Sequence, residues 1–226
     1  MINSPSNPTG VTYSREELKG LADVLLSHPH VLISTDDMYE HIIWGKEPFA
    51  NIVNVCEELF PRSIVLNGVS KAYAMTGWRI GYAGGPRTLI QAMKKVQSQS
   101  TSNPAAVSQA AAQEALDGDQ SCIQPMLTAF KERHDYVVQT LNRMPGVRCT
   151  ESNGTFYSFP DFSAAIASLK GVNDDVELAE FFLQKASVAL VPGSAFGAPG
   201  YLRLSFATSM EVLETALGRL KRALNG

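Results

Sequence analysis

The sequence lacks the features that mark membrane, nucleic-acid-binding and secreted proteins. Its 226 residues contain no apolar run close to the roughly 20 residues of a membrane-spanning helix. The formal net charge is −3, so no excess of basic residues favours nucleic acid or an acidic membrane surface as a partner. The first residues show no secretory signal pattern. We therefore expect a cytoplasmic protein that binds neither nucleic acids nor membranes.

Cysteine is also scarce. The three cysteines, Cys56, Cys122 and Cys149, are odd in number, lie far apart and form no Cys-x-x-Cys pair. This pattern disfavours both a disulfide framework and a zinc site, and it is typical of proteins from a reducing compartment. We therefore expect no bound metal ion.

What is present is an ordinary globular composition, with 45% hydrophobic and 18% charged residues. Strand-like runs at 30–35, 63–68 and 79–85 alternate with helical patterns, which favours an α/β fold with a mostly parallel sheet. In the second half of the chain, helices are followed by short strand-like segments. We therefore predict a partial large domain over residues 1–110 and a smaller C-terminal α+β domain over residues 111–226.

Several helix boundaries can also be predicted. Ser14 and Thr208 each have the spacing of a capping box, so each is expected to start a helix. Asn173 is expected to cap a third helix, which follows it directly. The run "FANIVNVCEELF" at 49–60 is interpreted as one helix that Pro61 ends.

Polar side chains that could take part in chemistry occur at the predicted strand ends. Asn7 follows the strand-like start "INSP", and Asp36 ends the run "VLIST", with Tyr39 three residues later. Ser70 and Lys71 follow the run "SIVLNG". Ligands of open α/β sheets bind outside the carboxyl ends of the strands. These residues are therefore expected to converge on one crevice, although they are far apart in the sequence.

The residue types in this set, together with an arginine, suit pyridoxal phosphate. A lysine amine can form a Schiff base with an aldehyde, and a carboxylate that faces a pyridine nitrogen keeps it protonated, so that the ring accepts electrons. A phenol and an amide can hydrogen-bond a ring oxygen, and an arginine can bind a phosphate through two parallel hydrogen bonds. Spacing alone does not single out this cofactor, because a generic phosphate-ligand site would need similar residues.

Four segments resemble motifs of a known family. In chain order they read "NSPSNPTG", "STDDMYEHIIW", "NGVSKAYAMTGWRIGYAGGP" and "YLRLSFATS". They are similar to successive motifs of the class I/II pyridoxal-phosphate-dependent aminotransferases of the aspartate aminotransferase type, which have the PLP-transferase fold type I. The third segment is highly specific, and the resemblance spans essentially the whole chain. It is strongest to the bacterial subgroup that acts on aspartate and sometimes on aromatic amino acids.

The resemblance implies a role for each residue of the cofactor site. Lys71 would be the catalytic lysine, which forms the Schiff base with pyridoxal phosphate and moves the proton. Asp36 would pair with the pyridinium nitrogen; the adjacent Asp37 is a rival, but the Asp-x-x-Tyr spacing favours Asp36. Tyr39 and Asn7 would hydrogen-bond the 3′-oxygen of the cofactor.

The resemblance also implies how phosphate and substrate are bound. Arg79 and Ser70 would hold the phosphate. A second phosphate-binding hydroxyl, often found three residues before the lysine, is absent because Gly68 stands there, so phosphate binding is expected to rely more on other groups. Arg203 would bind the α-carboxylate of the substrate through a bidentate pair, and Asn7 is expected to contact the substrate as well.

The residues by themselves also allow structural roles. Lys71 could be a surface charge, Tyr39 a packing residue, and Asn7 before a proline an ordinary turn residue. Arg79 could pair with a structural carboxylate. Arg203 lies within an apolar strand, where an unpaired charge is costly, so it too could form a structural ion pair.

The activity that the resemblance implies is an aminotransferase reaction. An amino group would move from an amino acid, aspartate or an aromatic one, to 2-oxoglutarate through the Schiff base on Lys71, in a ping-pong sequence. Two alternatives remain open. One is a carbon–sulfur lyase of the same fold, and the other is an aminotransferase-like sensing domain of a transcription regulator.

Compared with the family, the sequence lacks the first half of the large domain. That half includes the glycine-rich turn that binds the phosphate and the aromatic residue that stacks on the pyridine ring. We therefore expect the chain to be a fragment with little activity alone, and its full-length parent to be a homodimer.

Overall fold

Two β-sheets organise the chain, a four-stranded sheet in its first half and a three-stranded sheet in its second half. The computed structural model describes residues 1–45 and 47–225. The chain divides into two units, Met1–Ser6 with Val11–Leu127 and Asn7–Gly10 with Thr128–Gly226. The domain limits expected from the sequence, 1–110 and 111–226, stay a prediction.

The sheet of the first unit has the strand order β1-β2-β3-β4. Strands β1 (Ile2–Asn3), β2 (Ile33–Asp36) and β3 (Ser63–Gly68) run parallel, and β4 (Gly81–Gly84) pairs antiparallel with β3. The predicted α/β fold with a mostly parallel sheet is therefore confirmed. The antiparallel direction of β4 is a feature that the alternation of strands and helices did not indicate.

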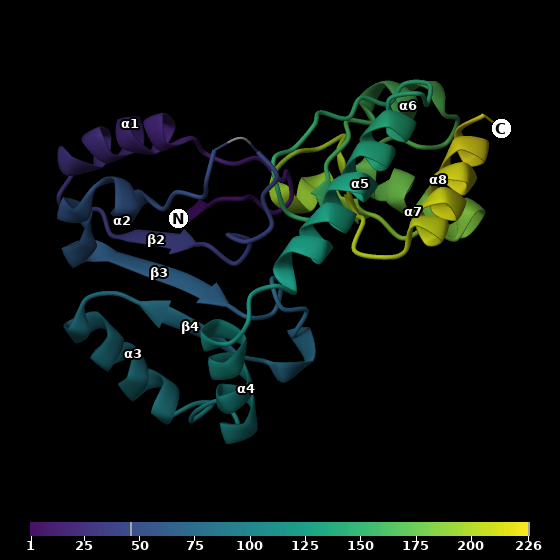
Figure 1. Ribbon diagram of the computed structural model, residues 1–226. Helices are drawn as coiled ribbons and strands as arrows, with labels where there is room; N and C mark the ends of the chain where they lie inside the picture. The colour runs from purple at the N-terminus through teal and green to yellow at the C-terminus, as the bar shows by residue number, and fades with distance from the viewer. Residues whose placement is uncertain (46, 226) are drawn as a thin grey trace. The chain divides into compact units, whose positions relative to one another are not determined.

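Helix α1 (Arg15–Leu26) and the short helix α2 (Ile52–Val55) pack against each other in the first unit (Figure 1). Their apolar residues join the sheet in one buried cluster: Leu18, Ala22, Ile33, Ala50, Ile52 and Leu59. Leu18 and Ala22 are four residues apart, so they lie on the same face of α1. Burial of this apolar surface stabilises the unit.

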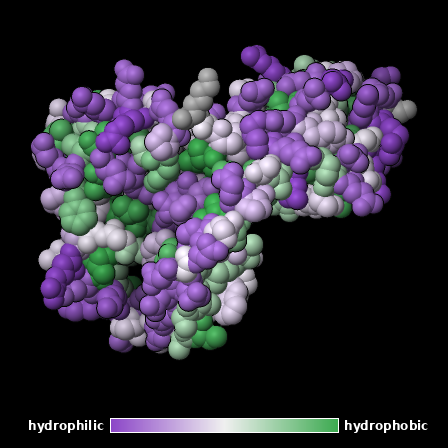
Figure 2. Space-filling view, in the orientation of Figure 1, coloured by the Kyte–Doolittle hydropathy of each residue, from purple (hydrophilic) through white to green (hydrophobic). Residues whose placement is uncertain are grey.

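Helices α3 (Arg87–Ser98) and α4 (Ala106–Asp117) follow β4 in the first unit. Leu89, Met93 and Val96 are spaced three and four residues apart and so form an apolar face of α3, and all three are exposed. Figure 2 shows hydrophobic residues among the hydrophilic ones on the surface of this unit. This apolar face of α3 is therefore not part of the buried core.

The sheet of the second unit is small and antiparallel. Strand β7 (Leu202–Ser205) is central, with β5 (Tyr157–Ser158) and β6 (Val191–Pro192) on either side. Arg203 lies opposite Val191 in this register. The strand-like segments of the second half therefore form a small sheet, as the sequence suggested.

Four helices surround this second core. They are α5 (Ile123–Leu141), α6 (Ser163–Ser168), α7 (Asp175–Ala186) and α8 (Met210–Leu224). Helices α7 and α8 pack against each other (Figure 1). The largest fully buried side chains of the unit are Leu141, Phe162, Leu178, Phe182, Leu202, Phe206, Leu217 and Leu220. The second unit therefore has its own apolar core.

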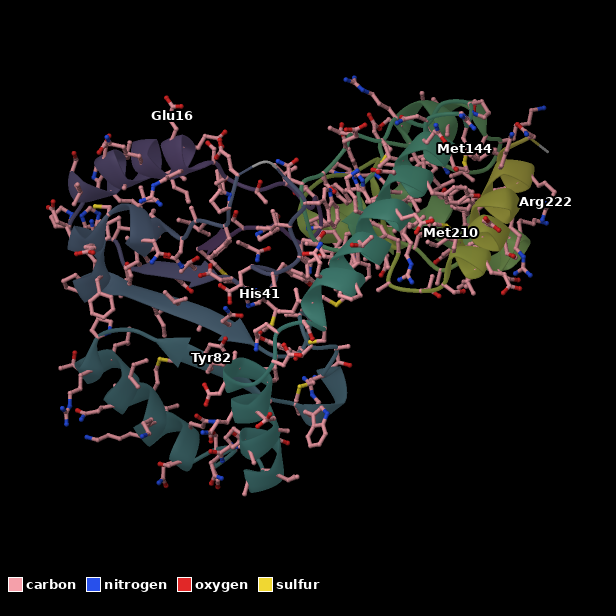
Figure 3. All side chains as sticks on the ribbon, viewed as in Figure 1. Glu16, His41, Tyr82, Met144, Met210 and Arg222 are labelled. Atoms are coloured by element: carbon pink, nitrogen blue, oxygen red, sulfur yellow. The ribbon has the colours of Figure 1, made fainter. Side chains whose placement is uncertain are left out.

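The predicted start of α1 is confirmed in detail. The side chain of Ser14 accepts a hydrogen bond from the backbone N–H of Glu17, and the Glu17 carboxylate accepts one from the Ser14 N–H at 2.8 Å. Glu16 in the same turn points away from the sheet (Figure 3). Its negative charge near the N-terminus is favourable for the helix dipole.

Two other helices begin one residue later than predicted. Asp174, not Asn173, caps α7 and accepts from the backbone N–H of Glu177. Ser209, not Thr208, caps α8. At both places two neighbouring residues have side chains that can cap a helix, and the backbone geometry of the folded chain selects the second.

The prediction of one helix over 49–60 is wrong. Helix α2 ends after a single turn, Cys56 is extended with φ −143°, and the 3-10 helix η1 (Glu57–Arg62) follows with Pro61 inside it. Arg62 donates hydrogen bonds to the backbone carbonyls of Leu25, His28 and Val31. These contacts tie the segment to the end of α1, so tertiary hydrogen bonds override the local helical pattern.

Within the described ranges, none of the helices combines the length and the apolarity that a membrane span needs. All three cysteines are free thiols. Burial raises the pKa of the Cys149 thiol to about 11, so this group is protonated at neutral pH.

Replacing Leu18 by alanine tests the first core. Leu18 is 1% exposed, and truncating a buried leucine typically lowers the unfolding free energy by about 2–5 kcal/mol. The control Leu21→Ala, on the same helix but 37% exposed, should change it by about 0.5 kcal/mol or less. Both tryptophans, Trp44 and Trp78, lie in the first unit, so urea denaturation followed by their fluorescence measures that unit. Equal losses in the two variants would contradict this packing.

Candidate active site

The register of the first sheet brings three chain segments to one edge. Asp36 ends β2 opposite Leu66 of β3, and Gly68 ends β3 opposite Gly81 of β4. Because β4 runs antiparallel, the residues that precede it lie at the same edge as those that follow β2 and β3. Arg79 precedes β4 and therefore lies at the same edge of the sheet as Asp36, which ends β2, and Lys71, which follows β3.

Ser70 and Lys71 lie in a turn directly after β3. The backbone N–H of Tyr73 donates to the Val69 carbonyl and that of Ala74 to the Lys71 carbonyl, both at 3.3 Å. Both Ser70 and Lys71 are half-buried. The turn thus fixes the backbone of the candidate catalytic lysine at the carboxyl end of a buried strand.

The structure distinguishes Asp36 from its rival, Asp37. Asp37 is 3% exposed, and its carboxylate accepts hydrogen bonds from the Thr35 hydroxyl and the Asn51 amide. Burial raises the pKa of Asp37, and these two hydrogen bonds only partly oppose the shift. Asp36 is half-buried and accepts from the backbone N–H of Met38 at 3.2 Å. The Asp37 carboxylate therefore binds side chains within the first unit, whereas Asp36 lies at the carboxyl end of β2.

Tyr39 follows in the same turn and is 5% exposed, so its ring is buried in the chain. Its carbonyl accepts from the backbone N–H of Ile42 at 2.8 Å. His41, labelled in Figure 3, belongs to the same segment, and its ring centroid lies 6.2 Å from that of Tyr73. The turn after β2 and the turn after β3 are therefore in contact through aromatic rings.

Arg79 has a strained backbone, and no carboxylate of the described residues lies within salt-bridge distance of it. Its φ is 52°, a left-handed conformation that residues other than glycine adopt at a cost of about 1–3 kcal/mol. The side chain is exposed, and its Nη1 donates to the Thr76 carbonyl at 2.8 Å. Among the residues that the structure describes, no carboxylate pairs with it. The structural ion pair that we considered for Arg79 is therefore not found.

Gly68 has a geometric reason to lack a side chain. A Cβ atom placed there would lie 3.1 Å from the Met38 Cε and 3.2 Å from the Gly81 Cα. These contacts are tighter than ordinary van der Waals contacts, so β3, β4 and the turn after β2 approach closely here. A second phosphate-binding hydroxyl at this position would require the neighbours to move.

Arg203 and Asn7 lie together in the second unit, although 196 residues separate them. The Arg203 Nη1 donates to the Asn7 Oδ1 at 2.8 Å. Its guanidinium carbon lies 4.5 Å from the ring centroid of Tyr157 and 5.1 Å from that of Phe196. No carboxylate forms a salt bridge with Arg203 in residues 1–45 and 47–225. An ion pair with a protein carboxylate is thus not its role among these residues.

The segment that holds Asn7 is anchored through Gly10. Its carbonyl accepts from the backbone N–H groups of Asn153 and Gly154 at 3.1 and 3.0 Å. Gly10 has φ +69°, and a Cβ there would lie 2.7 Å from the Gly154 carbonyl oxygen. Only glycine therefore fits. The "NPTG" turn was a visible signal for this position, but its partners, like the rings beside Arg203, could not be found by sequence reasoning.

The predicted site residues thus form two sets. Asn7 and Arg203 belong to the second unit. Asp36, Tyr39, Ser70, Lys71 and Arg79 belong to the first unit. Asp36 has no cationic partner, and Arg79 has no anionic partner, among the described residues. A ligand with a protonated ring nitrogen and a phosphate supplies both missing charges, so these residues fit pyridoxal phosphate chemically.

Other candidate sites are less well equipped. A cavity of about 450 Å³ in the first unit is lined by Leu66, Asn67, Gly81, Tyr82, Ala83, Ile90, Met93, Lys94, Gln97 and Pro104. None of the predicted site residues lines it. No group of three or more His, Cys, Asp or Glu side chains is placed to hold a metal ion in the part of the chain that the structure describes.

Comparisons with known proteins agree with the resemblance. Residues 1–220 match the family described as aminotransferase class I and II. The chain is 53% identical to the aspartate/prephenate aminotransferase of Nitrosomonas europaea over 100% of this chain and 58% of that protein. It is 46% identical to the aspartate aminotransferase of Geobacillus stearothermophilus over 98% of this chain and 56% of that protein. The chain therefore spans somewhat more than half the length of these relatives.

Solved structures give the same result. The aspartate aminotransferase of Rhizobium meliloti superposes with a TM-score of 0.94 at 46% identity, covering 99% of this chain and 57% of that one. The aromatic aminotransferase of Pyrococcus horikoshii superposes with a TM-score of 0.90 at 36% identity, covering 99% and 59%. The predicted family and fold are both confirmed.

The buried carboxyl of Asp37 predicts a pH-dependent stability. Because its folded-state pKa is raised above the ordinary value of 3.8, its contribution is complete below that pH and is lost as the pH rises through the folded-state pKa. Asp37→Asn removes the titration and keeps a donor and an acceptor for Thr35 and Asn51. Relative to this variant, the wild type should lose stability as the pH rises above 3.8 and through the raised folded-state pKa of Asp37. Urea denaturation at each pH measures this, and parallel pH profiles would show the assignment to be wrong.

Proposed function

We propose that this chain, which belongs to the class I and II aminotransferase family, is the part of an aminotransferase that binds pyridoxal phosphate and the substrate carboxylate. The observation that supports this most is the 53% identity, over the whole chain, to a relative named aspartate/prephenate aminotransferase. The donor that we propose is aspartate, with an aromatic amino acid as the second choice. The acceptor that we propose is 2-oxoglutarate, and the relative's name makes prephenate a further acceptor to test.

The residues at the edge of the first sheet are assigned to the cofactor. When bound, pyridoxal phosphate supplies an aldehyde carbon for the amino group and a pyridinium ring that accepts electrons. We assign the Asp36 carboxylate to hold the proton on the ring nitrogen and the Tyr39 hydroxyl to bind the ring oxygen. Arg79 and Ser70 are assigned to the phosphate, in keeping with the finding that no carboxylate in residues 1–45 and 47–225 pairs with Arg79.

Lys71 is assigned as the residue that binds the cofactor aldehyde and later moves the proton. Its Nζ acts as a general base that takes the α-proton of the bound amino acid. The half-buried turn after β3 supports this assignment, because it restricts the lysine backbone. A restrained general base needs less reorganisation to reach the reacting atom.

Arg203 and Asn7 are assigned to the substrate. A guanidinium presents parallel N–H groups that match the two oxygens of a carboxylate. One N–H of Arg203 is already bound to Asn7, which restricts the rotation of the guanidinium about its own axis. The α-carboxylate would then bind the remaining donors, and Asn7, which we also assign to the 3′-oxygen of the cofactor, would set their direction. In the first half of the exchange an amino acid enters and its oxo acid leaves, and in the second half a different oxo acid enters and leaves as an amino acid, so the amino group is conserved.

Covalent trapping tests the assignment of Lys71. The purified chain is incubated with pyridoxal phosphate and reduced with sodium borohydride, which fixes the cofactor to the amine that holds it. Peptide mass spectrometry should then find the added mass on Lys71. Lys71→Ala should lose this product, and before reduction it should also lack the visible absorbance of the Schiff base between the cofactor and the lysine. The exposed Lys19→Ala serves as the control and should be labelled like the wild type.

A titration of the same chain with pyridoxal phosphate, followed by borohydride trapping at each concentration, tests the phosphate site. Arg79→Gln should weaken pyridoxal phosphate binding by roughly tenfold or more, because a charge-assisted hydrogen bond to the phosphate is lost. Labelling spread over several surface lysines, with no preference for Lys71, would contradict the proposed cofactor site.

We further propose that the 226-residue chain turns over slowly, because it spans only 58% of the length of the Nitrosomonas europaea relative. With pyridoxal phosphate, aspartate and 2-oxoglutarate, oxaloacetate formation should proceed at a small fraction of the rate of that relative, assayed in parallel. A panel with aromatic donors and with prephenate as acceptor then ranks the substrates. Rates comparable to those of the relative would refute the proposal of slow turnover.

A further inference from the structure

We propose that Asp175 is a positioning residue for Arg203 and acts through the ring of Phe196. The inference rests on the proposed function of Arg203 in binding a substrate carboxylate. All three residues lie in the second unit. The buried carboxylate of Asp175 binds the loop that carries Phe196, and the Phe196 ring contacts the guanidinium of Arg203.

The first link is between Phe196 and Arg203. The Phe196 ring centroid lies 5.1 Å from the guanidinium carbon of Arg203, within the range of a cation–π contact. Tyr157 on the neighbouring strand lies at 4.5 Å. Tyr157 is held in the sheet, but Phe196 belongs to the 3-10 helix η3 (Gly193–Phe196), outside the strands. The Phe196 ring also meets the Phe159 ring edge-on, with centroids 6.0 Å apart, and its position further depends on what fixes its loop.

The second link is between Asp175 and that loop. Asp175 is 1% exposed, and its Oδ2 accepts from the backbone N–H of Ser194 at 2.7 Å. Its Oδ1 accepts from the backbone N–H of Gly200 at 3.2 Å. The two oxygens thus hold the residues on either side of Phe196, two before it and four after it. The carboxylate therefore adds two side-chain anchors to a loop whose backbone is also closed by hydrogen bonds from the Gly193 N–H to the Tyr201 carbonyl and from the Ala198 N–H to the Gly193 carbonyl.

The ionisation of Asp175 agrees with this geometry. Burial by itself raises the pKa of Asp175, but hydrogen bonding to the backbone and side chain of Ser194 and to the backbone N–H groups of Gly200 and of Asp175 itself outweighs it, so the pKa is lowered. The group is therefore charged at neutral pH, and charge-assisted hydrogen bonds are stronger than neutral ones. Asp175 is not matched by a salt bridge among the described residues. The negative charge of Asp175 is therefore stabilised by the backbone N–H groups of Ser194 and Gly200.

The consequence concerns the direction of the Arg203 donors. Bidentate binding of a carboxylate requires the guanidinium plane to be aligned with the incoming oxygens. Asn7 restrains one edge of that plane through a hydrogen bond, and the ring contacts restrain its tilt. If Asp175 no longer holds the loop, the Phe196 ring is held less firmly, and one of the restraints on Arg203 is weakened. Carboxylate affinity then falls although Arg203 itself is intact.

The experiment reads Arg203 directly by NMR of the ¹⁵N-labelled 226-residue chain. The Arg203 Nε–Hε signal is assigned from its absence in Arg203→Lys, and ring currents from Tyr157 and Phe196 should shift it from an ordinary arginine position. Titration with succinate, which has the two carboxylates of aspartate without the amine, measures the affinity. Amide signals of α8 report whether the fold is retained.

The variants separate positioning from stability. Phe196→Leu and Asp175→Asn should each move the Arg203 Hε signal towards an ordinary position and weaken succinate binding about two- to fivefold, the range for loss of a partly exposed cation–π contact. Phe196→Tyr keeps a ring and should retain the wild-type signal and affinity. The matched controls are Asp174→Asn, which still caps α7, and Phe181→Leu, whose recorded ring contact is with Phe182; both should behave like the wild type.

The outcomes distinguish this inference from the proposed function. If Phe196→Leu and Asp175→Asn leave the Hε signal and the succinate affinity unchanged while Arg203→Lys loses binding, the positioning role is wrong and the carboxylate site stands. If Arg203→Lys binds succinate like the wild type, or the wild type does not bind it, the proposed role of Arg203 fails. The Hε signal of the unliganded variants still decides the positioning in that case. Should Asp175→Asn not fold, Phe196→Leu decides alone.

Discussion

The close pairing of β3 with β4 at Gly68 and Gly81 is the constraint on which the first half of the candidate site depends. Two glycines face each other there, and a side chain at Gly68 would press on Met38 and on the β4 backbone. The pairing turns the chain back on itself, so that Arg79 reaches the edge where β2 and β3 end. A parallel β4 would have placed Arg79 at the opposite edge of the sheet, away from Asp36 and Lys71.

The charges in the molecule fall into two classes with different partners. Asp37 and Asp175 are almost fully buried, and protein donors satisfy their oxygens. Arg79 and Arg203 have no carboxylate partner among the described residues. A buried charge without a partner is costly, so the first class belongs to the scaffold. The second class suits a ligand that brings the opposite charge, which is how a phosphate and a carboxylate would bind.

Much of the fold could be predicted because local signals agreed with it. Ser14 and Glu17 satisfy each other within one turn, so their spacing was enough to place the start of α1. The segment 49–60 could not be predicted in this way, since Arg62 bonds to three carbonyls near the end of α1. Those partners are 31 to 37 residues away, and a local pattern contains no information about them.

The sequence by itself determined the family, the fold class and the residue types of the candidate site, because motifs such as "SKAYAMTGWRIGYAGGP" are contiguous and specific. It also placed Asp36, Ser70 and Lys71 at strand ends, since apolar runs and turns are local. Only the tertiary structure buried Asp37 against Thr35 and Asn51 while leaving Asp36 half-buried, joined Asn7 to Arg203, and put the Phe196 ring and its Asp175 anchor beside that arginine. These relations depend on strand register and on contacts between distant segments, which exist only once the chain has folded.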